Sequence, residues 1–464
     1  MAPPRPRTNL VEGPIPSTLL GLAWPMLIGI SAILLFNIVD TFWVGQLGAH
    51  ELAAMSFTFP VVFLVMSVSM GMSIGTAAVI SKAIGQGQHA GVRRLTTDAL
   101  ALSVVMVTVM GLAGLALLEP MFRALGATDS LMPLIRQYMV PWFLGVGFVV
   151  IPMVGNGAIR ATGDTRTPSL VMLAAGGTNL VLDPLLIFGI GPFPRMELRG
   201  AALATVLSYM VAFVAALWML GRRERMLDAR IPAVREVLAS WRAILHLGIP
   251  AAATNLLLPL SAGVLTRMVA AHGTHAVAGF GVATRLESLS MIGVSSLAAA
   301  LTPFVGQNFG ASRWERITGG VRFSMRAALM WGGGVALVLG LAAPYLAGLF
   351  NDDPEVIKTA TTYLRVVPWS YGGLSIALLA GSTFQALQRP FRAAQLVVLR
   401  LVVLAVPLAW LGSQWLGLPG LFAGVAAANL VVGCFAWWEV KRQVPSSEGL
   451  DAAATVVAPA GQAS

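Results

Sequence analysis

The chain has 464 residues, of which 57% are hydrophobic and only 11% are charged. Because a soluble protein normally carries about 25% charged residues, this composition excludes an ordinary globular enzyme and predicts an all-α polytopic membrane protein. The net charge of +10 does not indicate nucleic-acid binding, because the basic residues lie in short loops between apolar runs. The single cysteine, Cys434, excludes an intramolecular disulfide framework.

Twelve apolar runs are each long enough to cross a bilayer as a helix. The expected spans are 17–44, 52–83, 95–117, 128–158, 167–189, 200–221, 243–271, 277–308, 319–346, 356–386, 391–412 and 418–440. They predict a cytoplasmic N-terminal tail (1–16), an N-lobe (17–221), a cytoplasmic linker (222–242), a C-lobe (243–440) and a disordered cytoplasmic tail (441–464).

Loop charges orient the predicted bundle. With the N-terminus in the cytoplasm, about 20 Lys and Arg residues fall in inner segments and about 4 in outer ones. This bias predicts that both termini are cytoplasmic, as an even number of spans requires. We expect a multi-pass protein of a bacterial inner membrane.

The two lobes carry related features at a constant offset. Pro25, Val44, Gly48, His50 and Ala53 recur as Pro250, Val269, Gly273, His275 and Ala278. Tyr138 followed by Pro141-Trp142 likewise matches Tyr363 followed by Pro368-Trp369. Because six helices start and finish on the same side, these matches predict two pseudo-symmetric lobes related by an axis along the membrane normal. A cleft between such lobes is the expected substrate site.

Three carboxylates lie clearly within predicted spans: Asp40, Asp183 and Glu287. A charged side chain there costs roughly 2.5–3.5 kcal/mol on insertion scales, so it usually has a function. Counted at 1.5 Å per residue, Asp40 lies roughly 6 Å and Asp183 roughly 9 Å from the outer ends of spans one and five. Both therefore fall in the outer half of the N-lobe, where we expect them to meet.

Other polar side chains reach the same depth. One turn before each aspartate stand Asn37 and Asn179, and spans four and six supply Tyr138 and Thr205. Two carboxylates among amides and hydroxyls suit either a shared proton or a hard cation bound by oxygens. The alternative is a structural cluster of interhelical hydrogen bonds, each worth about 0.6 kcal/mol.

Three segments carry a resemblance to a known family. They are VDTFWVGQLG (39–48), RATGDTRTP (160–168) and NLVLDPLLIFG (179–189). The chain resembles the multidrug and toxic compound extrusion (MATE) family over all twelve spans, and within it the DinF-like prokaryotic branch. The resemblance implies two lobes in a V shape and coupling of export to ion entry in the N-lobe. It further implies that a set of residues couples ion movement to export, and these are Asp40, Asp183, Asn179, Tyr138 and Thr205 in this chain. It also implies that Asn156 lines the substrate cavity.

The remaining candidates have two interpretations each. We place Asn37 and Glu287 with Asn156 along the substrate cavity, but Glu287 would equally form a structural ion pair with Arg267 on span seven. Pro25 is either a static kink or a hinge; the resemblance implies that span one bends there when the aspartates change protonation. His272 and His275 lack a third ligand, so no metal site is expected.

Together these features predict a secondary antiporter that exports amphipathic, often cationic, organic compounds by alternating access. Its coupling ion is H⁺ or Na⁺, and no further cofactor is expected, because no G-x-x-x-x-G-K-[ST] motif for ATP occurs. Expected partners are small organic substrates and membrane lipids, and the protein is expected to be a monomer. A flippase or exporter of a lipid-linked or amphipathic metabolite is the alternative. An intramembrane enzyme is disfavoured, since no nucleophile and base share one depth.

Overall fold

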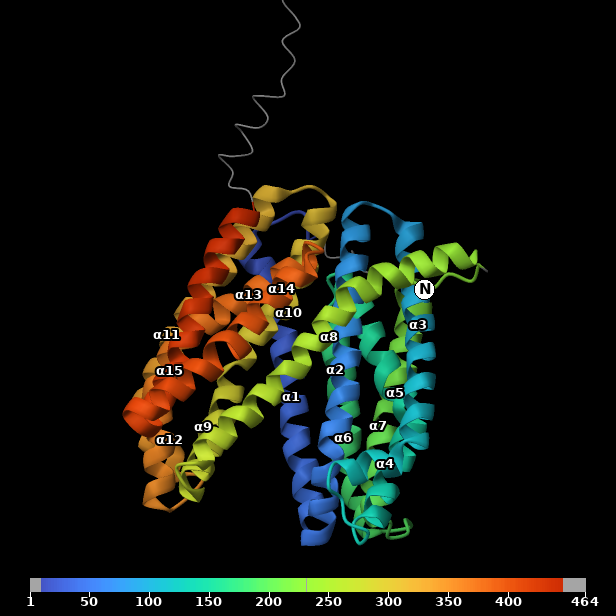
Figure 1. Ribbon diagram of the computed structural model, residues 1–464. Coiled ribbons are helices and arrows are strands. Elements are labelled where there is room, and N and C mark those ends of the chain that lie inside the picture. Colours follow the sequence, from blue (N-terminus) through green and yellow to red (C-terminus); the bar gives the residue numbers. More distant parts are fainter. Residues whose placement is uncertain (1–9, 231, 445–464) are drawn as a thin grey trace, which may run out of the picture. The chain divides into compact units, whose positions relative to one another are not determined.

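The computed structural model describes residues 10–230 and 232–444, and every element within them is a helix (Figure 1). The first half contains α1 (Ile15–Gly45), α2 (Ala49–Gly85), α3 (His89–Ala116), α4 (Leu118–Ala124), α5 (Met132–Ala161), α6 (Arg166–Phe188), α7 (Glu197–Trp218) and η1 (Met219–Arg223). The second half contains α8 (Val234–Ala270), α9 (Thr274–Ser290), α10 (Ile292–Gly310), α11 (Trp314–Gly348), α12 (Pro354–Val366), η2 (Val367–Ser370), α13 (Tyr371–Ala386), α14 (Pro390–Val398), η3 (Leu399–Ala405) and α15 (Val406–Gln443). The predicted all-α membrane architecture is confirmed.

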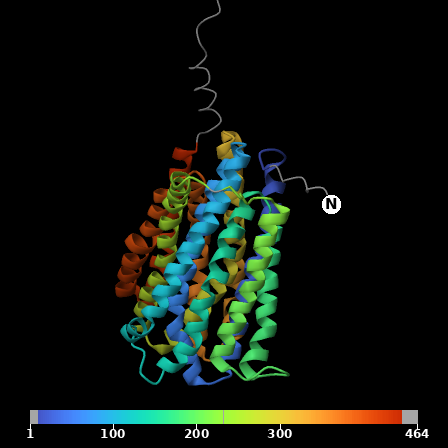
Figure 2. The ribbon, with the colours of Figure 1, turned by 90° about the vertical axis from the view of Figure 1, so that its right-hand side faces the viewer.

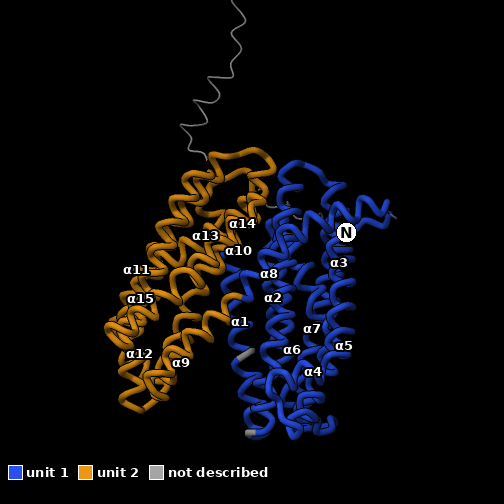
Figure 3. Tube along the Cα trace, in the orientation of Figure 1, with its two compact units in different colours: residues 1–8, 22–256 blue, residues 9–21, 257–464 orange. Residues whose placement is uncertain are grey.

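The described residues form two compact units (Figure 3). Unit 1 comprises residues 22–256, and unit 2 comprises residues 10–21 and 257–444. The prediction places the division in the linker 222–242, whereas contacts place it inside two helices, after Gly21 in α1 and after Leu256 in α8. Both positions lie close to prolines, whose missing N–H interrupts the helical hydrogen-bond ladder.

Unit 1 is built around α5, which packs against α2, α3 and α7, while α6 packs against α7. These helices run side by side through the unit (Figure 2). The core at one end of α5 is aromatic, and its largest fully buried side chain is Trp142. Close approach of α2 and α5 depends on Gly157, because a Cβ there would lie 2.5 Å from the backbone oxygen of Ser73.

Unit 2 is built around α13, which packs against α10, α11 and α15. Beside it, α12 packs against α9 and α11. Phe280, Tyr363 and Phe422 form an aromatic cluster with ring centroids 5.0–6.2 Å apart. Tyr371 is fully buried in the same core.

Nine helices in the described residues are long and apolar enough to cross a membrane, and the bent pair α9–α10 makes a tenth. The count falls short of the predicted twelve in two regions. The stretch from α12 to α13 is interrupted by the 3₁₀ turn η2 at Pro368. The run Pro390–Gln443 counts as one helix of 54 residues, roughly 80 Å, although a bilayer core is about 30 Å thick. Gly417, with φ of 63°, breaks this run in two.

Defined structure reaches into all three segments predicted to lie outside the lobes, namely the N-terminal tail, the linker and the C-terminal tail. Leu10 is fully buried, and its carbonyl accepts a hydrogen bond from Asn308 Nδ2 at 3.1 Å. Arg316 donates to the carbonyl oxygens of Glu12 and Gly13 at 2.9 and 2.7 Å. The residues just before α1 are therefore held on unit 2, and residues 1–9 lie outside the description.

At the other two places helices extend further than predicted. The helix α8 begins at Val234, inside the predicted linker. The helix α15 continues to Gln443, past the predicted start of the C-terminal tail, whose residues 445–464 lie outside the description.

The start of α12 is fixed by a capping aspartate. Asp353 accepts hydrogen bonds from the backbone N–H groups of Glu355 at 2.9 Å and Val356 at 3.4 Å. Its carboxylate also lies 3.0 Å from His275 Nδ1 at the start of α9. Chiefly the Glu355 N–H, then that of Val356 and the imidazole, hold the pKa of Asp353 below its ordinary value. The cap therefore joins two packed helices of unit 2 outside the membrane-spanning segments.

Replacing the cap tests this contribution. Asp353→Ala is expected to lower the melting temperature of the purified protein by roughly 1–2 °C, because the first turn of α12 loses its acceptor. The matched control is Asp352→Ala, which removes an exposed neighbouring carboxylate and leaves the cap intact. Because the folded-state pKa of Asp353 is lowered, its stabilisation is present at neutral pH and is lost as the pH falls below about 4. An equal effect of both variants, measured by differential scanning fluorimetry, would contradict the assignment.

Candidate functional site

Two carboxyl groups face each other inside unit 1. Asp40 on α1 and Asp183 on α6 lie close enough to share a hydrogen bond. Each lies five residues before the end of its helix, about 8 Å along the axis. Asp183 is fully buried, and its Oδ1 accepts a hydrogen bond from Asn179 Nδ2 at 3.0 Å. The structure thus brings together the two aspartates that the sequence places at one depth.

One oxygen of each carboxyl group lacks a hydrogen-bond donor in the described residues. Asp40 Oδ1 and Asp183 Oδ2 are buried, and neither has a hydrogen-bond partner among the described residues. Two carboxylates in contact away from water repel each other strongly when both are ionised. The geometry therefore suits one proton shared between the two groups, or a cation between them.

Tyrosine and threonine side chains close the site. Tyr138 on α5 is 6% exposed, and its hydroxyl is within hydrogen-bond reach of Thr205 on α7 while lying near both carboxyl groups. Thr205 Oγ1 itself donates to the carbonyl of Ala201 at 3.0 Å. Four helices of one unit thus supply polar groups to the aspartate pair, which we call the aspartate site (Asp40, Tyr138, Asn179, Asp183 and Thr205).

One residue of this neighbourhood is absent from the sequence prediction. Tyr209 on α7 interacts electrostatically with Asp40. It stands one helical turn after Thr205, so the same spacing that links Asn179 to Asp183 could have identified it.

Two further candidates do not join the aspartate site. Asn156 is 18 residues from Tyr138 along α5, about 27 Å, and its buried Oδ1 has no partner among the described residues. Pro25 is 15 residues from Asp40 on α1, about 22 Å, and the helix continues through it from Ile15 to Gly45. The side chain of Asn37 lies outside the description.

Glu287 belongs to a separate cluster in unit 2. Tyr363 donates its hydroxyl to Glu287 Oε2, and the guanidinium of Arg400 lies near enough to stabilise the carboxylate. The buried Tyr371 hydroxyl lies beside the same carboxyl without a hydrogen bond of good geometry. The predicted ion pair between Glu287 and Arg267 is wrong. The Arg267 side chain is exposed, and no ion pair joins it to Glu287 in the described part of the chain.

The π-helical element η3 is what presents Arg400 to this cluster. Arg400 is far from Glu287 in sequence, and it lies within an apolar run where no local pattern marks it as a partner. Sequence reasoning had no signal for this contact.

Arg160 is the second residue whose environment the sequence did not predict. We expected a loop charge, but its guanidinium turns into unit 1, where Nη2 donates to Ser73 Oγ at 2.9 Å. The hydroxyl of Ser73 in turn donates a hydrogen bond to the carbonyl oxygen of Met153 at 2.6 Å. No carboxylate in the described residues pairs with Arg160, and Asn156 stands one turn before it on α5. Burial of an uncompensated guanidinium is costly, so this position favours an anionic group.

No group of three His, Cys, Asp or Glu residues that could hold a metal ion occurs in the described ranges. His272 Nδ1 contacts the carbonyl of Met268 at 3.3 Å, whereas His275 faces Asp353. The two histidines therefore serve different local contacts.

Comparison with known proteins identifies relatives across the whole chain. The MatE family model matches twice, over residues 25–185 and 250–411. The two matches begin at Pro25 and Pro250, where the repeated features also begin. Both halves of the chain therefore derive from one structural unit.

Individual relatives cover nearly all of the sequence. The chain is 38% identical to a protein named FAD transporter from Shewanella oneidensis, over 94% of the chain and 96% of the relative. It is 24% identical to the multidrug export protein MepA of Staphylococcus aureus, over 90% and 92%. The crystal structure of the Vibrio cholerae MATE transporter VcmN in its bent form matches with a TM-score of 0.88, at 29% identity over 93% of the chain and 97% of that structure.

The pairing of Glu287 with Arg400 is open to a double-mutant cycle. Glu287→Gln leaves Arg400 without its opposing charge and is expected to lower the melting temperature of the purified protein. Adding Arg400→Gln is expected to restore part of the loss, with a coupling of about 0.5–3 kcal/mol. Arg267→Gln is the matched control. Additive effects of the Glu287 and Arg400 substitutions would show that the two groups do not interact.

Proposed function

The chain belongs to the MatE family, the multidrug and toxic compound extrusion transporters, and from that premise we propose a secondary antiporter that exports organic solutes in exchange for H⁺ or Na⁺. The observation that carries the proposal is the closeness of Asp40 and Asp183, each of which has one buried oxygen without a hydrogen-bond donor in the described residues. The family and its relatives are transporters of small molecules. The coupling ion, the substrate and the site roles are our inference.

The coupling step follows from the charge of the pair. Without a bound ion the two carboxylates repel each other, and a proton or a sodium ion removes that repulsion. Oxygens of Asn179, Thr205 and Tyr138 stand beside the pair and suit the oxygen coordination that a hard cation requires. Ion binding therefore favours a conformation in which α1 and α6 stay together at this depth.

Export requires that ion and substrate favour opposite conformations. If each binds one state better than the other, binding of one promotes release of the other. A cycle of this kind needs no ATP.

Pro25 lies on the same helix as Asp40, at a position where α1 can bend when the charge at Asp40 changes. Its ring removes the hydrogen bond that the carbonyl of Gly21 would accept, and the division of contacts between the units falls directly after Gly21. We propose that α1 bends here when the charge at Asp40 changes.

The substrate class is supported by two observations. The relative named FAD transporter shares 38% identity, against 24% for the multidrug exporter MepA. Inside unit 1, Arg160 offers a guanidinium without a paired carboxylate. We therefore propose FAD or a similar phosphate-bearing solute as the leading substrate, with Arg160 and Asn156 contacting its anionic part. This agrees with export of an amphipathic metabolite, the alternative derived from the sequence.

Export of cationic amphipathic compounds is the second candidate. The multidrug relatives support it, as does the negative charge of the aspartate site.

The loop charges support a bacterial inner membrane with both termini in the cytoplasm. We propose that the protein works as a monomer.

The role of the pair is tested by neutralising each acid. Asp40→Asn and Asp183→Asn are each expected to abolish gradient-driven export from proteoliposomes, because the one remaining carboxylate lacks the repulsion between two charges that ion binding relieves. Asp129→Asn is the matched control, since this carboxylate is exposed in the loop before α5. Separately imposed pH and sodium gradients identify the coupling ion. Wild-type transport in both variants would exclude the aspartate site as the coupling site.

A substitution of Arg160 distinguishes export of FAD from export of cationic compounds. Arg160→Gln is expected to raise the KM for FAD at least about tenfold, because a charge-assisted contact to phosphate is lost, while export of a cationic dye is unchanged. Arg136→Gln on the same helix is the matched control, since Arg136 pairs with Glu119. Equal losses for FAD and dye would assign Arg160 a structural role.

A further inference from the structure

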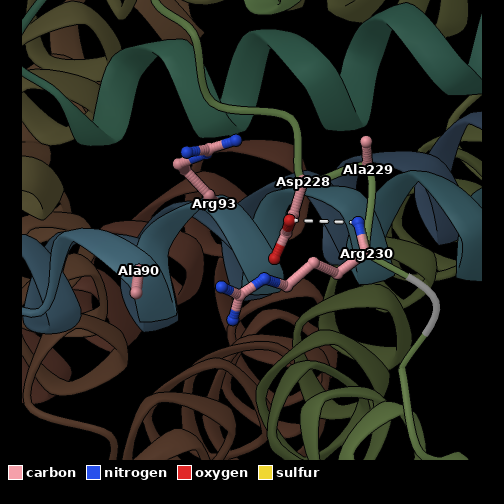
Figure 4. A pocket seen from close by; sticks show the side chains of 5 residues that line it. All are labelled: Ala90, Arg93, Asp228, Ala229 and Arg230. Carbon is pink, nitrogen blue, oxygen red and sulfur yellow. Dashed lines mark hydrogen bonds between the residues drawn. The ribbon is translucent and has the colours of Figure 1, made fainter.

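A pocket of about 440 Å³ lies where the first turn of α3 meets the loop between η1 and α8 (Figure 4). Ala90 and Arg93 line it from α3, and Asp228, Ala229 and Arg230 line it from the loop. All five residues belong to unit 1. The pocket is distant from the aspartate site, because Arg93 lies at the other end of the unit, near the end of α2.

The loop backbone is held in place by four hydrogen bonds. Asp228 N donates to Thr97 Oγ1 at 2.8 Å, and Arg93 donates through Nε and Nη2 to the carbonyl of Leu227 at 3.1 and 3.0 Å. Arg94 Nη1 donates to the carbonyl of Arg230 at 3.3 Å. The pocket wall is therefore formed before any ligand arrives.

The charged ends of the lining side chains remain available. Asp228 Oδ1 accepts from the backbone N of Arg230 at 3.2 Å (Figure 4). No ion pair in the described ranges involves Asp228, Arg93 or Arg230. Among the described residues, Arg93 Nη1 and the guanidinium of Arg230 have no hydrogen-bond acceptor. The pocket thus presents two cations and one anion.

The pocket lies at the depth of lipid headgroups. The 28 residues of α3 span about 42 Å, which exceeds a bilayer core of about 30 Å by roughly 6 Å at each end. Arg93 is the fifth residue of α3 and therefore stands at the edge of the core. Further along, Val104, Val109 and Leu112 are 48–65% exposed, as expected of a face that contacts acyl chains.

These charges fit a zwitterion with a phosphate and a primary ammonium group. The phosphate suits the guanidinium groups, which donate to it in a fixed geometry. The ammonium suits Asp228, to which it can donate hydrogen bonds. A headgroup with only negative charge would place that charge beside Asp228, and a choline has no N–H to donate. The volume equals about fifteen water molecules, enough for a hydrated headgroup.

We propose that this pocket binds the phosphoethanolamine headgroup of a lipid in the adjacent leaflet, with its phosphate on Arg93 and Arg230 and its ammonium on Asp228. The bound lipid would connect α3 to the loop that leads into α8. The proposal is independent of the transported substrate and of the coupling ion.

The test measures binding of phosphatidylethanolamine, phosphatidylglycerol and phosphatidylcholine to the full chain by native mass spectrometry. The wild type is expected to prefer phosphatidylethanolamine by about tenfold over the other two. Arg230→Gln is expected to lower its affinity about tenfold. Arg235→Gln, which removes an exposed arginine from the first turn of α8, is the control and is expected to change nothing.

Asp228→Asn tests the headgroup assignment without disturbing the loop, because an amide oxygen still accepts from the N–H of Arg230. This variant is expected to bind phosphatidylglycerol as tightly as phosphatidylethanolamine. Unchanged selectivity in Asp228→Asn, or equal binding of the three lipids by the wild type, would overturn the proposal. Soluble phosphoethanolamine that displaces the lipid at equal concentration would likewise overturn it, by making the ligand a soluble metabolite. Size-exclusion profiles and circular dichroism verify that each variant is folded.

Discussion

The contact between Asp40 and Asp183 is the interaction on which this structure depends. Each acid stands about one and a half turns from the end of its own helix, and α5 and α7 add Tyr138 and Thr205 around them. Repulsion between two buried carboxylates is strong in a medium from which water is excluded. This repulsion is the reason why we propose that the packing of α1 against α6 at this depth depends on a bound proton or cation.

The two halves of the chain match the same family model. The acids within their helices nevertheless have different surroundings. In unit 1 the acids face each other, and no cation of the described chain lies between them. In unit 2 Glu287 has the guanidinium of Arg400 beside it and accepts a hydrogen bond from Tyr363. A carboxylate with a built-in counter-charge gains little from an external cation, whereas an uncompensated pair gains much. This difference favours unit 1 as the place of ion coupling.

Unit 1 also contains a positively charged site, at Arg160. Arg160 is half-buried in unit 1, where no carboxylate of the described residues pairs with it, and it lies about 33 Å from Tyr138 along α5. The negative and positive sites of one unit thus lie near opposite ends, where an inward ion and an outward anionic solute would be separated along the transport direction. Arg93 and Arg230 lie apart from these two sites and line the pocket that we propose binds a lipid headgroup.

The sequence by itself determined the all-α membrane architecture, the repeat and the depth of Asp40 and Asp183, because helix rise and apolar run length are local properties. It also placed Asn179 on the face of Asp183, since that spacing is one turn. Only the tertiary structure decided that Glu287 pairs with Arg400 rather than Arg267, that Arg160 turns inward, and that Leu10 is held by Asn308. These contacts join segments distant in sequence, and they depend on how each helix is rotated and packed, which no local pattern specifies.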